Sequence, residues 1–248
     1  MFPIRDHNPS QTRPIITVAL IVINLLVFVS YRSLSGDPAA LAGFYQTWAL
    51  VPAHVSAGSD WYTLITSMFL HAGFMHLGGN LLFLWIFGDN LEDKLGHAGF
   101  LAFYLVCGVA AGLSQMAASP ASLVPTIGAS GAIAGVMGGY LLLFPKARID
   151  VLFIFIVFFK IFPIPAWAML GVWFVLQIVN GIGTDISGGG VAFWAHVGGF
   201  VAGFVLVLPV WLRLGGTRFW RQSAGRPPHP ATTYRYGQSN IPKVTRKR

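Results

Sequence analysis

Residues 128–139 read Gly-Ala-Ser-Gly-Ala-Ile-Ala-Gly-Val-Met-Gly-Gly and lie within a long apolar segment. Gly131, Gly135 and Gly139 recur there every four residues, and small residues at this spacing let membrane helices pack closely. Ser130 is the polar residue of the stretch, and strongly polar groups at membrane depth generally have a function. The stretch therefore predicts a tightly packed membrane helix with a candidate nucleophile in its first turn.

The composition of the whole chain is that of a membrane protein. Of its 248 residues, 55% are hydrophobic and only 10% are charged, whereas soluble domains have about 25% charged residues. We therefore expect an all-α polytopic membrane protein with one compact helical domain. The single cysteine, Cys107, excludes an intramolecular disulfide.

Six apolar stretches, some of them with flanking turns, approach the roughly 20 residues needed to cross a bilayer. They comprise residues 15–30, 74–87, 98–116, 127–144, 164–179 and 191–212. The apolar segment Val151–Ile161 is too short to span, so we expect it to be interfacial or re-entrant. The predicted organisation is a cytoplasmic N-terminal segment (1–13), a six-span domain (14–213) and a basic, disordered tail (214–248).

The distribution of positive charge predicts the orientation in the membrane. With six spans, every Lys and Arg except Arg32 falls on one side, and basic loops stay in the cytoplasm. Both termini are therefore expected to be cytoplasmic, whereas a seventh span would move the basic tail outside. The short N-terminus without a targeting segment favours a bacterial inner (plasma) membrane.

Spans two, four and six enter the membrane from the outer face, so their first turns share one depth. His76 and Asn80 lie in span two, Ser130 in span four and His196 in span six. Taken singly, the serine could be a packing residue, and the asparagine or histidine an interhelical hydrogen-bond donor. Their convergence at one depth predicts a functional site.

Other classes of site and function fit less well. A metal could use His71, His76 and His196, but zinc usually also takes Cys, Asp or Glu, and these spans hold no acidic residue near the histidines. We therefore expect no metal and no cofactor. The basic tail suits anionic lipid rather than nucleic acid, and a small-solute transporter would favour internal repeats, which we do not find.

Small residues also predict how the candidate residues meet. Ala195, Gly199 and Gly203 repeat every four residues on span six, as the three glycines do on span four. Close approach of these two helices would bring Ser130 and His196 within a hydrogen bond of about 2.6–3.2 Å, as a nucleophile and its base require.

The chain resembles the rhomboid intramembrane serine proteases, of the bacterial six-span type, over roughly residues 15–212. The resemblance rests on three motifs: His71-Ala-Gly-Phe-Met-His76-Leu-Gly-Gly-Asn80, Gly128-Ala129-Ser130-Gly131 and Ala195-His196-Val197-Gly198-Gly199. It implies a six-helix bundle with a partly embedded first loop (35–70), and a lateral substrate gate that includes Ala166 and Trp167.

The resemblance also implies the role of each site residue. Ser130 would be the nucleophile and His196 its general base, while His76 and Asn80 would form the oxyanion hole, with the Ser130 N–H as a further donor. The remaining motif residues would be structural near the site, namely His71, Gly128, Gly131 and Gly199.

The predicted function is an intramembrane serine endopeptidase that uses a Ser-His dyad. It would cleave single-pass transmembrane proteins near the outer membrane face, with substrates and the lipid bilayer as its partners and the oligomeric state left open. The alternative is a non-proteolytic rhomboid-like module for membrane-protein binding or quality control. Two departures from the family pattern stand out: Tyr62-Thr63 replaces a common Trp-Arg pair, and Ala134 replaces an aromatic that packs on the histidine. His196 must therefore be oriented by another group.

Overall fold

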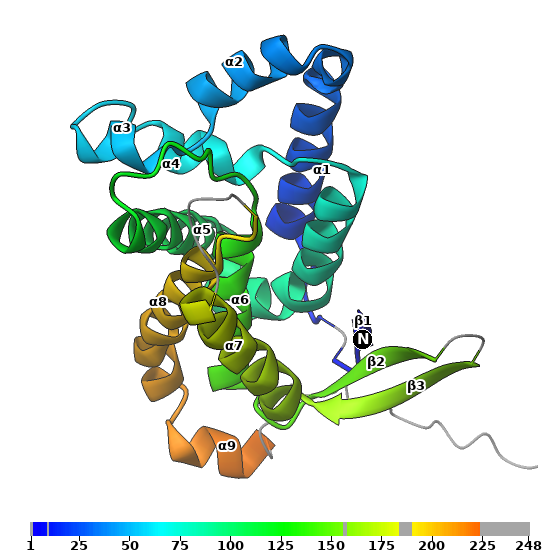
Figure 1. The fold of residues 1–248 in the computed structure, drawn as a ribbon. Coiled ribbons are helices and arrows are strands. Elements are labelled where there is room, and N and C mark those ends of the chain that lie inside the picture. The colour runs from blue at the N-terminus through cyan, green and yellow to red at the C-terminus, as the bar shows by residue number, and fades with distance from the viewer. Residues whose placement is uncertain (1, 9, 156–157, 184–189, 224–248) are drawn as a thin grey trace, which may run out of the picture.

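The computed structural model describes residues 2–8, 10–155, 158–183 and 190–223. Most of them are helical (Figure 1). Within these ranges, three helices are long and apolar enough to cross a membrane: α5 (Phe74–Ala118), α7 (Ala166–Gly183) and α8 (Phe193–Arg213). Two shorter apolar helices, α1 (Ile15–Ser30) and α6 (Ser130–Leu143), lie among them.

Helix α5 contains both the second and the third predicted spans. Its 45 residues are interrupted at Gly96, where φ is 69° and ψ is 165°. Glycine adopts this left-handed backbone without the clash that a side chain would cause. Both apolar stretches are helical, and the polar residues between them are also helical on either side of the kink.

Helix α6 lies at the centre of the bundle, and every residue from Gly131 to Tyr140 is buried. It packs against α8 through the predicted glycines: a Cβ added at Gly199 would collide with the Gly131 carbonyl, and one at Gly203 with the Gly135 backbone. The prediction of a close α6–α8 contact is confirmed.

The predicted first loop folds into short helices at one end of the bundle (Figure 1). They are η1 (Arg32–Gly36), α2 (Pro38–Trp48), α3 (Pro52–Ser56), α4 (Thr63–Thr66) and η2 (Ser67–Phe69). Asp37 caps α2 by accepting hydrogen bonds from the N–H groups of Ala39 and Ala40, each at 3.0 Å. An isolated bridge between Leu50 and Thr126 joins these helices to the connection before α6.

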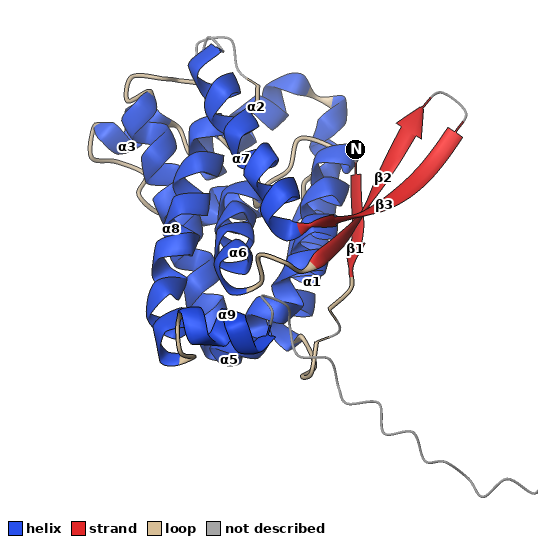
Figure 2. Cartoon of the chain, turned by 90° about the horizontal axis from the view of Figure 1, so that it is seen from below, coloured by secondary structure: helices blue, strands red, loops and turns tan. Residues whose placement is uncertain are grey.

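The all-α prediction missed a three-stranded antiparallel sheet of order β1-β2-β3. The segment expected to be interfacial or re-entrant forms the hairpin of β2 (Arg148–Phe155) and β3 (Phe158–Pro165), and β1 (Phe2–Asp6) from the predicted N-terminal segment pairs with β2. The run Val-Leu-Phe-Ile-Phe is too short to span but rich in residues that favour strands. The hairpin projects sideways from the helices (Figure 2).

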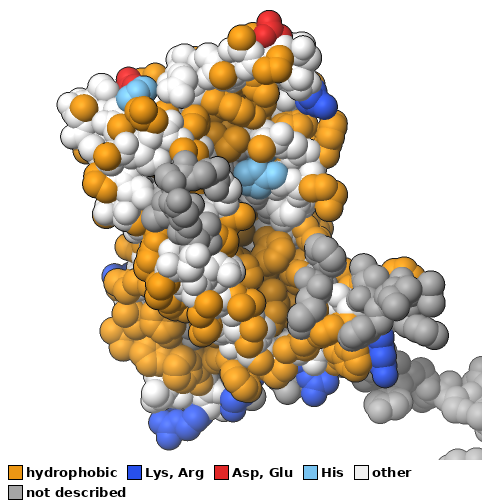
Figure 3. Space-filling view, in the orientation of Figure 1, with side chains coloured by type: hydrophobic (Ala, Val, Ile, Leu, Met, Phe, Trp, Pro, Cys, Tyr) orange, Lys and Arg blue, Asp and Glu red, His pale blue; other side chains and the backbone are white. Residues whose placement is uncertain are grey.

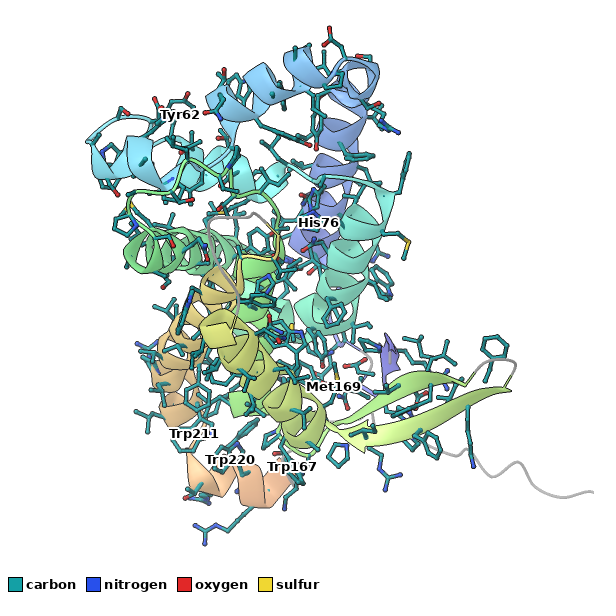
Figure 4. The ribbon with its side chains drawn as sticks, in the orientation of Figure 1. Tyr62, His76, Trp167, Met169, Trp211 and Trp220 are labelled. Atoms are coloured by element: carbon teal, nitrogen blue, oxygen red, sulfur yellow. The ribbon has the colours of Figure 1, made fainter. Side chains whose placement is uncertain are left out.

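The predicted disordered tail is also partly helical. Helix α9 (Thr217–Ser223) packs under the bundle, where Trp220 donates from Nε1 to the Leu142 carbonyl at 2.9 Å. The Trp211 and Trp220 rings lie 4.8 Å apart (Figure 4). Disorder was therefore the wrong prediction for this helix, and residues 224–248 lie outside the described part of the chain.

The surface is divided along the bundle axis. Hydrophobic side chains cover the middle of the face in Figure 3, most of its Lys and Arg side chains lie at the α9 end, and its acidic side chains lie at the end formed by α2 and α3. This banding is typical of a protein whose middle is surrounded by lipid.

Candidate active site

Ser130 is the first residue of α6, and the turn before it is built around Gly128. Gly128 has φ +127°, and its N–H donates to the Ser67 carbonyl at 2.9 Å. A Cβ added at this position would lie 2.7 Å from Nε2 of His76. The glycine therefore allows the chain to turn into α6 while the His76 ring lies directly against the turn.

His196, on α8, meets Ser130 across the glycine contact. Its Nε2 lies 2.7 Å from the Ser130 Oγ, although the two residues are 66 positions apart in the sequence. Gly131, which follows Ser130, and Gly199, three residues after His196, let the helix backbones approach closely. The structure thus brings the predicted nucleophile and base into hydrogen-bonding contact.

The second nitrogen of the His196 ring has a partner that the sequence analysis missed. Nδ1 lies 2.8 Å from Oε1 of Gln177 on α7, and the Gln177 Nε2 donates to the Trp173 carbonyl at 3.3 Å. The Trp173 ring lies beside the imidazole, with 5.7 Å between ring centroids. A glutamine within the otherwise apolar stretch 164–179 was the sequence signal that could have identified this residue.

His76 and Asn80 are placed differently relative to Ser130. His76 lines the same cavity as Ser130 and His196. Asn80 is buried, and its Nδ2 donates to the His76 carbonyl at 2.7 Å. Among the described residues, those lining the cavity include His76 but not Asn80. The structure therefore brings one of the two predicted oxyanion donors, His76, to the cavity beside Ser130, while Asn80 supports the first turn of α5.

His71 lies behind His76, with 5.0 Å between the ring centroids. The Tyr31 hydroxyl accepts from the His71 N–H at 2.7 Å and donates to the His71 carbonyl at 2.8 Å. Burial, followed by the neighbouring His76, lowers the pKa of His71 to about 4, so that its ring is neutral. These contacts fix the segment that leads into α5.

The cavity over Ser130 has a volume of about 510 Å³. Polar and aromatic residues from several elements line it, among them His76, Gln115, Ser130, Trp194 and His196. In the described part of the chain no three His, Cys, Asp or Glu side chains come together as metal ligands would. The groups present are a hydroxyl, imidazoles and amides, which suit acyl transfer by a nucleophilic hydroxyl.

The fold and this site together define a helical integral membrane protein with a serine hydroxyl and an imidazole paired between its apolar helices. A family model described as the rhomboid domain matches residues 58–213, more than half of the chain. The chain belongs to the rhomboid family, whose members are generally intramembrane serine proteases.

Individual relatives come from both mitochondria and bacteria. The chain is 33% identical over 183 residues to "Rhomboid protein 1, mitochondrial" of Saccharomyces cerevisiae. This match covers 69% of this chain and 50% of the yeast protein. It is 30% identical over 148 residues to "Rhomboid protease GluP" of Bacillus subtilis, covering 60% of this chain and 26% of the relative. A third relative, the "Putative rhomboid protease YdcA" of Bacillus subtilis, is 41% identical over 85 residues, which are 34% of this chain and 42% of that protein. The chain thus matches half or less of the length of these relatives.

Proposed function

We propose that this protein is an intramembrane serine endopeptidase in which Ser130 is the nucleophile and His196 is the general base. The observation that supports this most directly is the 2.7 Å contact between the His196 Nε2 and the Ser130 Oγ. A serine hydroxyl is a weak nucleophile unless a base within this distance accepts its proton. Both residues border a cavity large enough for an extended peptide segment and water.

The proposed reaction has two halves that use the same pair. His196 accepts the Ser130 proton while Oγ bonds to the scissile carbonyl carbon, and it then gives that proton to the leaving amine as the C–N bond breaks. In the second half, His196 takes a proton from water, whose oxygen attacks the acyl-enzyme. Return of the proton to Ser130 Oγ releases the new carboxyl end and restores the enzyme.

The oxyanion formed in each half needs hydrogen-bond donors. His76 lines the cavity beside Ser130, and the N–H of Ser130 lies in the first turn of α6, where amides lack intrahelical partners. Asn80 can contribute if its side-chain amide turns from the His76 carbonyl toward the cavity. Loss of one such donor typically lowers kcat about 10²–10³-fold. We expect His76→Ala to lower kcat more than Asn80→Ala, because His76 lines the cavity and Asn80 does not.

The proposed topology has six spans, α5 contributing two of them, with both termini in the cytoplasm. It places the basic α9 end inside and Ser130 in the outer half of the membrane, so that single-pass transmembrane proteins would be cut near the outer face. A bacterial inner (plasma) membrane is the proposed location, and two of the relatives are Bacillus subtilis proteins.

The test compares the wild type with Ser130→Ala in detergent and in proteoliposomes, using reporters with one transmembrane segment. Ser114→Ala is the matched control, because Ser114 is a membrane serine whose hydroxyl donates to the Ala110 carbonyl of its own helix and not to His196. We expect cleavage by the wild type and by Ser114→Ala, and none by Ser130→Ala or His196→Ala. Equal cleavage by all variants, or none by any of them across several reporters, would contradict the proposal.

Labelling with a fluorophosphonate probe gives a second measurement that needs no substrate. Wild type and Ser114→Ala should be labelled, and peptide mapping should place the adduct on Ser130. Labelling at another serine would exclude Ser130 as the nucleophile. Retention of full labelling in His196→Ala would exclude His196 as the base that activates it.

A further inference from the structure

The structure points to Gln177 as a positioning residue that holds His196 in the tautomer needed to deprotonate Ser130. The inference rests on the proposed function and adds to it a third, uncharged member on helix α7. Gln177 touches neither the Ser130 hydroxyl nor the cavity over it, among the residues described. It acts through the imidazole.

The direction of the hydrogen bonds follows from a backbone carbonyl. The Trp173 carbonyl oxygen can only accept, so the amide nitrogen of Gln177 faces it at 3.3 Å. The amide oxygen of Gln177 then faces the His196 Nδ1 at 2.8 Å, and an oxygen can only accept from that nitrogen. Nδ1 is therefore the protonated nitrogen of the neutral ring. Nε2 keeps its lone pair and faces the Ser130 hydroxyl at 2.7 Å.

An amide suits this position better than a carboxylate would. A carboxylate held between apolar helices loses its hydration, and that penalty is several kcal/mol unless a positive charge lies close. Gln177 is 8% exposed, and no Lys, Arg or acidic side chain contacts it among the described residues. The amide accepts the Nδ1 proton without bringing a charge into the bundle.

The contact also accounts for His196 being oriented without an aromatic at position 134. Ala134 is fully buried on α6 and presents only a methyl group. Trp173 lies beside the imidazole, with an angle of 35° between the two rings. Trp173 and Gln177 are four residues apart on α7 and so share one face of that helix, from which both contact the His196 ring.

The packing of α7 makes this hydrogen bond sensitive to the position of the helix. Buried residues on α7 follow a single stripe, namely Ala166, Leu170, Gln177 and Gly181. Val172, Val175, Leu176 and Val179 are exposed on the rest of its surface. Gln177 thus stands in the narrow contact between α7 and the bundle, where a small outward movement of α7 separates it from Nδ1.

The experiment uses the full-length protein with Gln177→Met, Gln177→Glu and the control Asn180→Leu. Methionine keeps the length of the side chain but accepts no comparable hydrogen bond, whereas glutamate keeps the acceptor and adds charge. Asn180 is an exposed amide three residues further along the same helix. Melting curves in detergent establish that each variant is folded.

We expect Gln177→Met to lower kcat about 10–100-fold with KM changed less than about threefold, because the base is mis-oriented and not the substrate. Gln177→Glu should retain kcat within about tenfold, and the acidic limb of its pH–rate profile should move to higher pH because a carboxylate stabilises the imidazolium. Asn180→Leu should behave as the wild type. Wild-type kcat in Gln177→Met, or an equal loss in Asn180→Leu, would overturn the assignment.

A measurement without catalysis separates this inference from the proposed function. With histidine labelled by ¹⁵N in a Ser130→Ala background, the His196 signals are identified by their loss in His196→Ala. They should report an Nδ1–H tautomer in the parent and a different tautomer or an exchanging ring after Gln177→Met. Unchanged signals would refute the role of Gln177, whatever the activity. If the Nδ1–H tautomer is lost in Gln177→Met but the wild type with Ser130 intact cleaves no reporter, the protease is refuted and the positioning role is kept.

Discussion

At the scale of single residues, the site depends on Gly128. Gly128 has a positive φ, which side chains rarely allow. In addition, the Nε2 atom of His76 occupies the space that a Cβ would need. Its N–H also holds the Ser67 carbonyl, so the turn before Ser130 is tied to the end of the first loop. A substitution of Gly128 is therefore expected both to strain the backbone and to displace His76, a proposed oxyanion donor.

Gly128→Ala should abolish or strongly reduce cleavage, and Gly58→Ala is its matched control. Gly58 also has a positive φ, +91°, but nothing lies within 4 Å of an added Cβ. Both variants bear the left-handed backbone penalty of about 1–2 kcal/mol, and we expect only Gly128→Ala to lose kcat by about 10²-fold or more. Thermal melts and reporter cleavage measure the two effects separately. Equal activity of the two variants would show that His76 does not need this space.

At the scale of elements, the contact between α6 and α8 sets the distance between Ser130 and His196, the proposed nucleophile and base. Gly203 lies on α8 against the Gly135 backbone, and Gly199 lies against Gly131. Helices that approach this closely gain van der Waals contact along their whole interface. The same interface fixes the spacing of Ser130 and His196, because Ser130 lies on α6 and His196 lies on α8.

Gly203→Ala should push α8 away from α6 and lower both stability and activity. Overpacking of this kind costs about 1–3 kcal/mol, and a change below 1 Å in the helix spacing is enough to break a 2.7 Å hydrogen bond. Gly171→Ala on α7, where an added Cβ meets nothing within 4 Å, should retain activity and melting temperature. Loss of activity in both variants to the same degree would contradict the assignment of the α6–α8 contact as the element that sets the geometry.

The sheet at the other end of the bundle is joined to the helices through Asp6 of β1. Asp6 accepts hydrogen bonds from the Tyr140 hydroxyl on α6 at 3.0 Å and from the Asn90 amide on α5 at 3.1 Å. Burial, together with the charge of Asp89, raises the pKa of Asp6 from 3.8 to about 7. The protonated carboxyl is therefore the form that the folded state prefers.

This pKa predicts how the strand responds to pH. Because the folded-state pKa lies above the unfolded value, the contribution of Asp6 to stability is fully present below about pH 4 and is lost as pH rises toward about 7. Relative to Asp6→Asn, which is neutral throughout, the wild type should lose about 1–3 kcal/mol between pH 4 and pH 7.5. Denaturation curves of both proteins in detergent at several pH values measure the difference. Parallel curves would show that Asp6 does not titrate in this window.

At the scale of the whole molecule, charge and hydropathy divide the protein into three bands. The basic α9 end and the end formed by α2 and α3 flank the apolar middle (Figure 3). Strand β1 and helix α9, the first and last described elements, lie toward the same end of the bundle as the hairpin (Figure 1). The cavity over Ser130 lies nearer the opposite end.

The orientation can be tested by cysteine labelling in intact cells. Ala40→Cys on α2 should react with a membrane-impermeant maleimide, whereas Arg218→Cys on α9 should react only after permeabilisation, because basic segments stay inside. Both positions are exposed, and the parent protein should remain unlabelled because Cys107 is fully buried. The reverse pattern would invert the topology and place Ser130 in the inner half of the membrane.

The sequence by itself predicted the class of the protein, the apolar helices, and the serine and histidine that the structure brings within 2.7 Å of each other. Hydropathy is a local property, so 15–30 and 191–212 could be recognised without knowing their neighbours, and α1 and α8 follow them closely. The glycine repeats around Ser130 and His196 likewise encode close packing in each helix separately.

Only the tertiary structure decided which polar groups meet. Gln177 could be seen as a polar residue in an apolar span, but its contact with His196 depends on how α7 is rotated against α8. Asn80 was expected beside His76 over the nucleophile, and it donates instead to the carbonyl of the preceding turn. The hairpin was missed for a similar reason: a short apolar run suits a strand or a re-entrant segment, and pairing with β1, far away in the sequence, selects the strand. Partners distant in sequence determine such choices, and a local pattern contains no information about them.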